Sequence, residues 1–324
     1  MLTTGLCCIM ALPIVAPPDP AVSDADPAEL PAPVDAPPVA PIRIANFPRL
    51  SEVETRAPDD DRAPLRDAPR AGGGVVDHLR SIPWEAGGVA AGITALGIFN
   101  WNWGSSGFHF SSEGWFGRDT SSFGSDKLGH AYSTYVMTEF LSAAIRRNAR
   151  APKRAQVSAA AISMALMTYV EVFDGFSGDH GFAWEDMAAN TAGAAFSVLR
   201  HTVPGLNDKL DFRLHYIPSG NVGWRPITDY SGQRYVLAVK LAGFEPFADG
   251  PSRFVELHGG YYARGFTERE KLRGVEPKRA LFVGIGFNLQ QLISRDRGEK
   301  SRFHRAARSA LEYVQVPYTA AYSR

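Results

Sequence analysis

The distribution of proline constrains the fold of this 324-residue chain more than any other feature. Fourteen of its 23 prolines fall between Pro13 and Pro69, and the sequence around them is rich in alanine and aspartate and poor in aromatic residues. Such a segment cannot bury enough apolar surface to offset the conformational entropy lost on folding. We therefore expect a disordered Pro-rich tether over residues 26–73, followed by a folded part of roughly 250 residues, which is ample for a hydrophobic core.

A short apolar run precedes the tether. Leu2–Val15 is too short to span a bilayer but has the length of the apolar part of a signal peptide. We expect residues 1–25 to be an export signal or anchor, so the predicted location is the cell envelope. Cys7 and Cys8 are the only cysteines. Cleavage of this segment as an export signal would leave no thiol for a disulfide, a zinc ligand or a nucleophile. The alternative is that one of the two cysteines carries a lipid anchor.

Charge and motif content exclude several function classes. The chain has 34 Lys+Arg against 34 Asp+Glu, so a strongly basic nucleic-acid binder is excluded and no nucleic-acid partner is expected. No Ser-His-Asp signature, phosphate loop or dinucleotide fingerprint is found. Any chemistry must therefore come from residues that the fold brings together.

Hydrophobic periodicity predicts a small helical bundle in residues 74–215. The predicted helices cover 84–103, 126–147, 155–174 and 186–201. The first is rich in glycine and alanine and ends in Trp-Asn-Trp, so that a marginal transmembrane helix and a buried globular helix both fit it.

The pattern changes to period two in residues 216–324. Alternation predicts antiparallel strands at 235–241, 254–261 and 281–289, with 311–321 as a fourth candidate. We thus predict an α+β fold in which an Ala/Gly-rich bundle of about four helices is followed by an antiparallel β meander. An open sheet of this size would pack on the helices or be completed by a partner protein or a second copy.

Polar residues gather at three predicted helix ends. If the helices run antiparallel with short loops, the start of the second, the end of the third and the start of the fourth lie at one end of the bundle. The residues there form a candidate catalytic or binding cluster: Asp126, Lys127, His130, Glu171, Asp174, Asp186 and Asn190. Four carboxylates and one lysine leave a formal charge of −3, which an apolar interior does not hold without a bound cation, proton uptake or a charged histidine.

These residues also have purely structural interpretations. Asp126 and Asp186 stand near helix N-termini, where a carboxylate can cap free N–H groups. Lys127 could simply neutralise them, and His130 could be a core histidine bonded to a carboxylate.

Three motifs resemble one family. They are Asp126-Lys-Leu-Gly-His130, Glu171-Val-Phe-Asp174-Gly-Phe-Ser177 and Asp186-Met-Ala-Ala-Asn190-Thr-Ala-Gly193. In this order they closely resemble the YfiM-type family of predicted periplasmic lipoproteins, and more weakly the VanZ-like membrane proteins. The resemblance covers about residues 84–293 and implies an envelope location and a helical core around the polar residues, without an established activity. Ala183 departs from the pattern, since relatives often have serine there.

Three hypotheses for function remain open. The first is a non-enzymatic, membrane-associated envelope module whose cluster fixes packing and whose sheet associates with membrane or envelope components. The second is a hydrolase or transferase acting on a lipid or cell-wall headgroup, with His130 as general acid or base. The third is a divalent-metal module with candidate ligands His130, Glu171, Asp174 and Asp186, a set that suits Mn, Fe or Zn better than copper.

Overall fold

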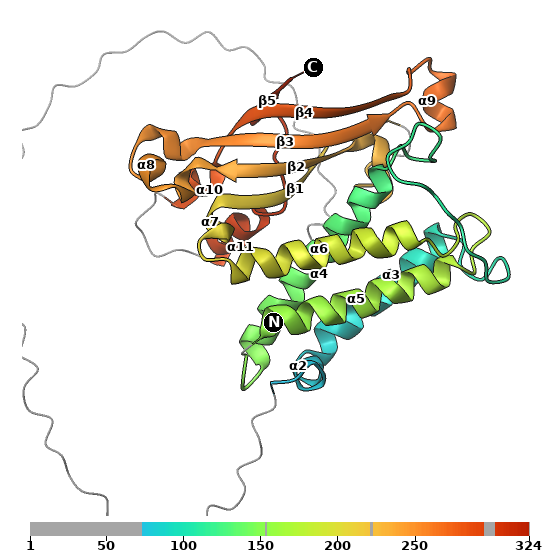
Figure 1. Ribbon diagram of the computed structural model, residues 1–324, viewed down its shortest axis with the longest axis horizontal. Helices are drawn as coiled ribbons and strands as arrows, with labels where there is room; N and C mark the ends of the chain where they lie inside the picture. Colours follow the sequence, from blue (N-terminus) through green and yellow to red (C-terminus); the bar gives the residue numbers. More distant parts are fainter. Residues whose placement is uncertain (1–72, 153, 221–222, 295–301, 324) are drawn as a thin grey trace, which may run out of the picture. The chain divides into compact units, whose positions relative to one another are not determined.

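A computed structural model of the protein describes residues 73–152, 154–220, 223–294 and 302–323. The predicted export signal and all but the last residue of the predicted tether lie outside these ranges. The fold class is confirmed, because a group of helices is followed by an antiparallel sheet (Figure 1). The helices before the sheet are α2 (Val75–Ser81), α3 (Pro83–Asn100), α4 (Ser125–Asn148), α5 (Ala155–Asp174), α6 (Trp184–Thr202) and α7 (Leu206–Lys209).

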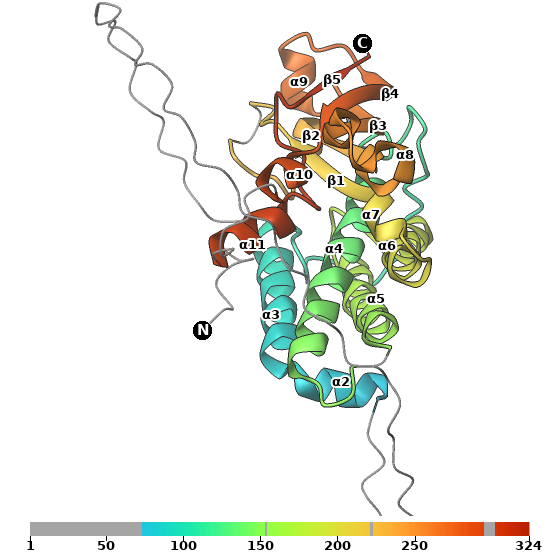
Figure 2. The same ribbon diagram turned by 90° about the vertical axis from the view of Figure 1, so that its left-hand side faces the viewer.

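The helices α4, α5 and α6 pack on one another in all three pairs, and α3 lies beside α4 and α5 (Figure 2). Their main apolar core contains Ile82, Leu141, Ile145 and Ile162, all less than 9% exposed. Where α4 crosses α6, a Cβ on Gly193 would lie 2.0 Å from the carbonyl oxygen of Ala131. Only glycine permits this approach, which brings the start of α4 next to the start of α6.

The apolar helix α3 is mostly exposed and so differs from a buried globular helix, which was one of its two predicted environments. Trp84 and Phe99 are 84% and 81% exposed, while Ala86 and Gly97 are buried. By length and composition, α5 could cross a membrane, and α2 with α3 would be a second candidate only as one span broken by an 87° bend. Half of the apolar window of α5 is buried among its neighbours, so membrane insertion of these helices stays a prediction.

The C-terminal region forms a five-stranded antiparallel sheet in the order β1-β2-β3-β4-β5. The strands are β1 (Leu210–Tyr216), β2 (Gln233–Lys240), β3 (Val255–Arg264), β4 (Lys278–Phe287) and β5 (Ala320–Tyr322), and short helices α8 (Glu245–Ala248), α9 (Glu268–Leu272), α10 (Leu289–Ser294) and α11 (Arg302–Ala310) accompany them. β1 begins before residue 216, where we expected the β region to start. Within the fourth candidate segment, only 320–321 belong to a strand, and Val314 forms an isolated bridge to Leu214.

In most soluble proteins the apolar face of an antiparallel sheet is buried and the polar face is exposed. In this sheet the charged face is buried and part of the apolar face is exposed. On one face Asp211, Arg213 and Glu256 are buried and paired: Arg213 donates to Glu256 at 2.6 and 2.9 Å and also to Asp211. Gln290 donates to Asp211, and Gln315 accepts from Arg213, so the C-terminal segment covers this face.

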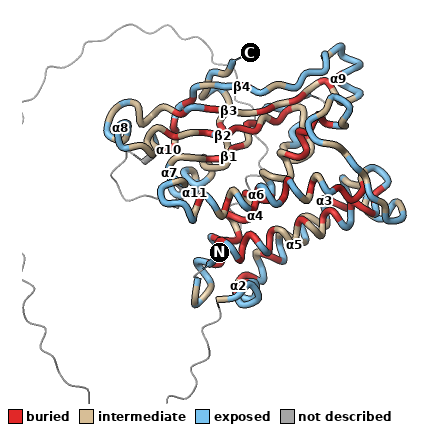
Figure 3. Tube along the Cα trace, in the orientation of Figure 1, coloured by how far each residue is buried: buried red, intermediate tan, exposed pale blue. Residues whose placement is uncertain are grey.

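The other face is apolar. Tyr132 of α4 packs on Phe212 and Tyr235 and covers the β1–β2 side of it. The β4 side is exposed, as Figure 3 shows. The helical bundle therefore covers only part of the apolar face.

Substitution of Val239 by proline tests whether β2 is hydrogen-bonded between two neighbouring strands. Val239 is paired with Leu210 of β1 and Leu257 of β3. Val239→Pro removes a ladder N–H and should lower the free energy of unfolding by about 3 kcal/mol or more, measured by chemical denaturation. Val239→Ala keeps the N–H and serves as the control. Equal stability of the proline variant and the control would contradict this pairing.

Candidate functional site

The start of α4 is fixed by the backbone before it. Gly124 has a φ of 80°, and a Cβ there would lie 2.6 Å from the carbonyl oxygen of Trp115. This left-handed turn begins the helix at Ser125 and places Asp126 and Lys127 in its first turn.

Lys127 lies at the centre of one group of carboxylates. Its Nζ is 2.7 Å from Glu113 Oε2, 2.7 Å from Asp126 Oδ2 and 2.8 Å from Asp186 Oδ1. Its side chain is only 2% exposed. The predicted neutralising role of Lys127 thus corresponds to a buried ion-pair network that joins α4, α6 and the segment before α4.

Glu113 was not among the predicted residues. It stands in the irregular segment between α3 and α4, where neither helical nor strand spacing marks a residue. The nearby residues Ser112 and Trp115 are uncharged, so they do not mark this segment as part of a charged site.

His130 lies between two carboxylates from different helices. Its Nδ1 is 3.3 Å from Glu171 Oε1, and its Nε2 is 3.9 Å from Asp186 Oδ1. Thus Asp186 faces both Lys127 and His130. Side-chain exposure is 16% for His130, 1% for Glu171 and 5% for Asp186.

The two remaining predicted residues make other contacts. Asp174 accepts a hydrogen bond from Trp103 Nε1 at 2.6 Å, and Asn190 accepts one from Thr134 Oγ1 at 2.9 Å while its amide nitrogen has no partner. Trp103 is a second residue that spacing could not identify, since it lies 71 positions from Asp174.

The capping interpretation does not describe Asp126 and Asp186. Neither α4 nor α6 has a side-chain hydrogen bond at its N-cap, and the N-cap residues are Gly124 and Ala183. Instead Asp126 accepts from Ser122 Oγ at 2.5 Å and from Lys127. These carboxylates therefore point into the cluster, and at the start of α4 it is Ser122 Oγ that accepts a hydrogen bond from the backbone N–H of Asp126, at 3.3 Å.

Burial and neighbouring charges shift the pKa values of the carboxylates and the histidine in the cluster. Burial raises the pKa of Glu113 to about 7 and that of Glu171 to about 8. Burial lowers the pKa of His130, but attraction to Asp186 and Glu171 outweighs it and raises the pKa overall. Burial also acts to raise the pKa of Asp126, but the charge of Lys127 outweighs burial and lowers the pKa overall. Proton uptake by Glu113 and Glu171 and the charges of Lys127 and His130 therefore offset the excess of carboxylates in the cluster.

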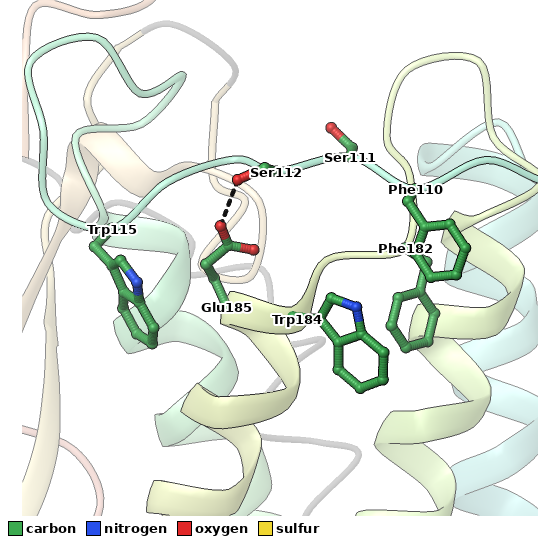
Figure 4. A pocket seen from close by; sticks show the side chains of 7 residues that line it. All are labelled: Phe110, Ser111, Ser112, Trp115, Phe182, Trp184 and Glu185. Carbon is green, nitrogen blue, oxygen red and sulfur yellow. Dashed lines mark hydrogen bonds between the residues drawn. The ribbon is translucent and has the colours of Figure 1, made fainter.

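A pocket opens beside the cluster but is not lined by it. It has a volume of about 390 Å³ and is lined by Phe110, Ser111, Ser112, Trp115, Phe182, Trp184 and Glu185. Figure 4 shows Glu185 hydrogen-bonded to Ser112, with Trp115 on one side and Trp184 and Phe182 on the other. The pocket is thus mainly aromatic, and its lining includes the chain neighbours of Glu113 and Asp186.

Loss of the Lys127 charge should destabilise the protein strongly. Lys127→Met would leave the buried carboxylates of Asp126 and Asp186 and the partly buried one of Glu113 without their shared counterion, and we expect a loss of about 3–5 kcal/mol in the free energy of unfolding. The matched control is Lys271→Met, because Lys271 also pairs with a carboxylate at 2.7 Å but is 52% exposed. That control should change stability by less than about 1 kcal/mol. Equal effects of the two substitutions in chemical denaturation would contradict the central role of Lys127.

Stability should fall as the pH rises from about 5 to 8. Glu113 and Glu171 have folded-state pKa values above the unfolded value of 4.5, so the folded protein retains protons that the unfolded chain releases. Their stabilising contribution is complete below pH 4.5 and is lost towards pH 7 and 8, at up to ~1.4 kcal/mol per pH unit for each retained proton.

Chemical denaturation of chelator-treated protein at several pH values measures this slope. Glu113→Gln should reduce it between pH 5 and 7. Glu185→Gln is the control, since Glu185 is exposed and its pKa is lowered by the hydrogen bond from Ser112. A slope that both substitutions leave unchanged would be evidence against the raised pKa of Glu113.

Comparison with known proteins gives one match. Residues 112–202 match a family described as predicted periplasmic lipoprotein (DUF2279), and this range contains Glu113 and all seven predicted cluster residues. No curated protein and no solved structure matches the chain significantly. No match tests the weaker likeness to VanZ-like proteins, which stays a prediction. The suspected resemblance to the YfiM-type family is confirmed over residues 112–202, which are similar to this predicted periplasmic lipoprotein family, and the protein is an exported protein of the cell envelope.

Proposed function

We propose that this protein is a non-enzymatic envelope module that rests on a membrane surface through the apolar face of its sheet. One observation carries the proposal. Four alternate residues of β4 point to the same side and remain exposed: Leu281, Val283, Ile285 and Phe287, at 84%, 67%, 60% and 65%. A contiguous apolar surface of this kind marks an interaction site.

The neighbouring strands extend this surface. Ile285 is paired with Leu257, and Val283 is paired with Gly259, which is itself paired with Leu237. Paired residues of an antiparallel sheet point to the same side, and Leu257 and Leu237 are 46% and 41% exposed. The exposed apolar surface therefore spans three strands. Polar residues on the covered side and apolar residues on the open side are typical of strands that face lipid.

Two further observations favour lipid over another protein. The matched family is described as lipoprotein, and a lipid anchor would hold the chain close to a membrane. Lys278 and Arg279 are exposed at the beginning of β4, where they could attract anionic headgroups next to the apolar row.

A second copy of the chain is the competing occupant. β5 pairs with β4 only from Gly284 to Gly286, so among the described residues no strand pairs with the outer edge of β4 from Lys278 to Phe282. An added strand from another copy could complete the sheet there.

The enzyme hypothesis has less support from the cluster. Asp126, Lys127 and Asp186 are at least 92% buried, and the aromatic pocket does not include them. Catalysis on a lipid or cell-wall headgroup therefore remains a hypothesis, with His130 as its most accessible predicted residue.

Vesicle flotation tests the proposal. The full chain with Cys7→Ser and Cys8→Ser carries no acyl chain, and it should float with vesicles of phosphatidylcholine and phosphatidylglycerol. Replacing Leu281, Val283 and Ile285 by threonine should reduce the bound fraction at least tenfold, because each buried aliphatic side chain contributes about 1.5–3 kcal/mol.

The control is Leu272→Thr, because Leu272 is 86% exposed but lies in α9. It should bind as the parent does. A parent chain that stays unbound overturns lipid contact. A concentration-dependent dimer that the three threonines dissolve would identify a second copy as the occupant.

A further inference from the structure

Two groups of ligand-type side chains meet within the polar cluster. One consists of Glu113, Asp126 and Asp186, and the other of His130, Glu171 and Asp186; in each group one nitrogen or oxygen from every member lies within 4.8 Å of the others. The first group already surrounds a cation of the protein itself, the ammonium of Lys127, at 2.7–2.8 Å. In the second group, the only ion pair of Glu171 within the described ranges is with His130.

The second group contains polar atoms that lack hydrogen bonds. Among the residues that the structure describes, His130 Nδ1, Glu171 Oε1 and Asp186 Oδ1, one atom from each member, have no hydrogen-bond partner. Asp186 Oδ1 is within ion-pair distance of Lys127, and the two other atoms are 3.3 Å apart, but neither contact is a hydrogen bond. Glu171 and Asp186 are at least 95% buried. Buried polar atoms are nearly always satisfied, so the unpaired atoms of His130 and Glu171, which converge on Asp186 Oδ1, indicate a ligand between them.

We propose that His130, Glu171 and Asp186 bind one divalent metal ion. Two carboxylates balance the charge of such an ion, so the site would be neutral without proton uptake. One imidazole with two carboxylate oxygens suits Mn²⁺, Fe²⁺ or Zn²⁺ better than copper. Ligand atoms around one ion lie roughly 3–3.5 Å apart, given metal–ligand distances of about 2.0–2.2 Å, so rotation of side chains is sufficient to close the observed spacing.

The surroundings define which residues belong to the site. Asp174, which we predicted as a candidate ligand, is engaged by Trp103 and is not part of the proposed set. His130 keeps 16% of its side chain exposed, and this gives an ion a route to the two buried carboxylates. The metal site is independent of the membrane contact, since its three residues all lie in the helices α4, α5 and α6.

Metal titration of the full chain tests the site. Chelator-treated protein is titrated with Mn²⁺ and with Zn²⁺ in a calorimeter, and its thermal unfolding is followed with and without each ion. The wild type should bind one ion per chain and unfold at a higher temperature with the ion. Glu171→Gln and His130→Gln keep side chains of similar size and should bind at least about tenfold more weakly.

Two carboxylates outside the proposed set provide the controls. Glu113→Gln alters the group around Lys127, and Glu185→Gln alters the exposed residue next to Asp186 in the chain. Both variants should bind the metal ion with a dissociation constant within about twofold of wild type. A wild type that binds neither ion, or a loss in Glu113→Gln as large as in Glu171→Gln, overturns the proposal. If Glu171→Gln does not fold, Asp186→Asn replaces it, and a thermal shift by the ion that persists in both Asp186→Asn and His130→Gln likewise overturns the site.

Discussion

The ammonium of Lys127 is the contact on which the polar end of the helical domain depends. It joins Glu113 from the segment before α4, Asp126 from α4 and Asp186 from α6. Without it, two buried carboxylates and the partly buried Glu113 would repel one another in a medium of low dielectric constant. Because Asp186 also faces His130, the position of His130 relative to Glu171 depends indirectly on the same lysine.

Helical spacing was sufficient to predict the convergence of the three helix ends. Residues four apart share a face, and antiparallel helices with short loops bring alternate ends together; Lys127, His130 and Asp186 lie together accordingly. Spacing could not predict the roles of Glu113 and Trp103. Both lie outside regular elements, so their contacts depend on the path of the segment between α3 and α4, for which a single sequence contains no period.

The sheet shows a different limit of sequence patterns. Alternation identified the long strands, but alternation alone does not decide which face is buried. Here the charged face is buried, because Arg213 and Lys240 neutralise Asp211 and Glu256 and the segment after β4 covers them. β1 follows α7 without a break, so the change from helical spacing to period two occurs at Leu210, before the expected start at residue 216, and no turn residues separate the two patterns there.

The energetics of buried charge bear on why the cluster exists. The bundle has an apolar core around Leu141 and Ile145 and does not need ion pairs to pack. Replacing a buried ion pair by apolar residues of similar volume is often neutral or stabilising, whereas removing one partner is costly. A cluster in which Lys127 serves one group of carboxylates, while His130, Glu171 and Asp186 retain atoms without hydrogen bonds, is therefore poorly explained by stability alone. Its incomplete pairing is easier to understand as the cost of a site that becomes satisfied when a cation is bound.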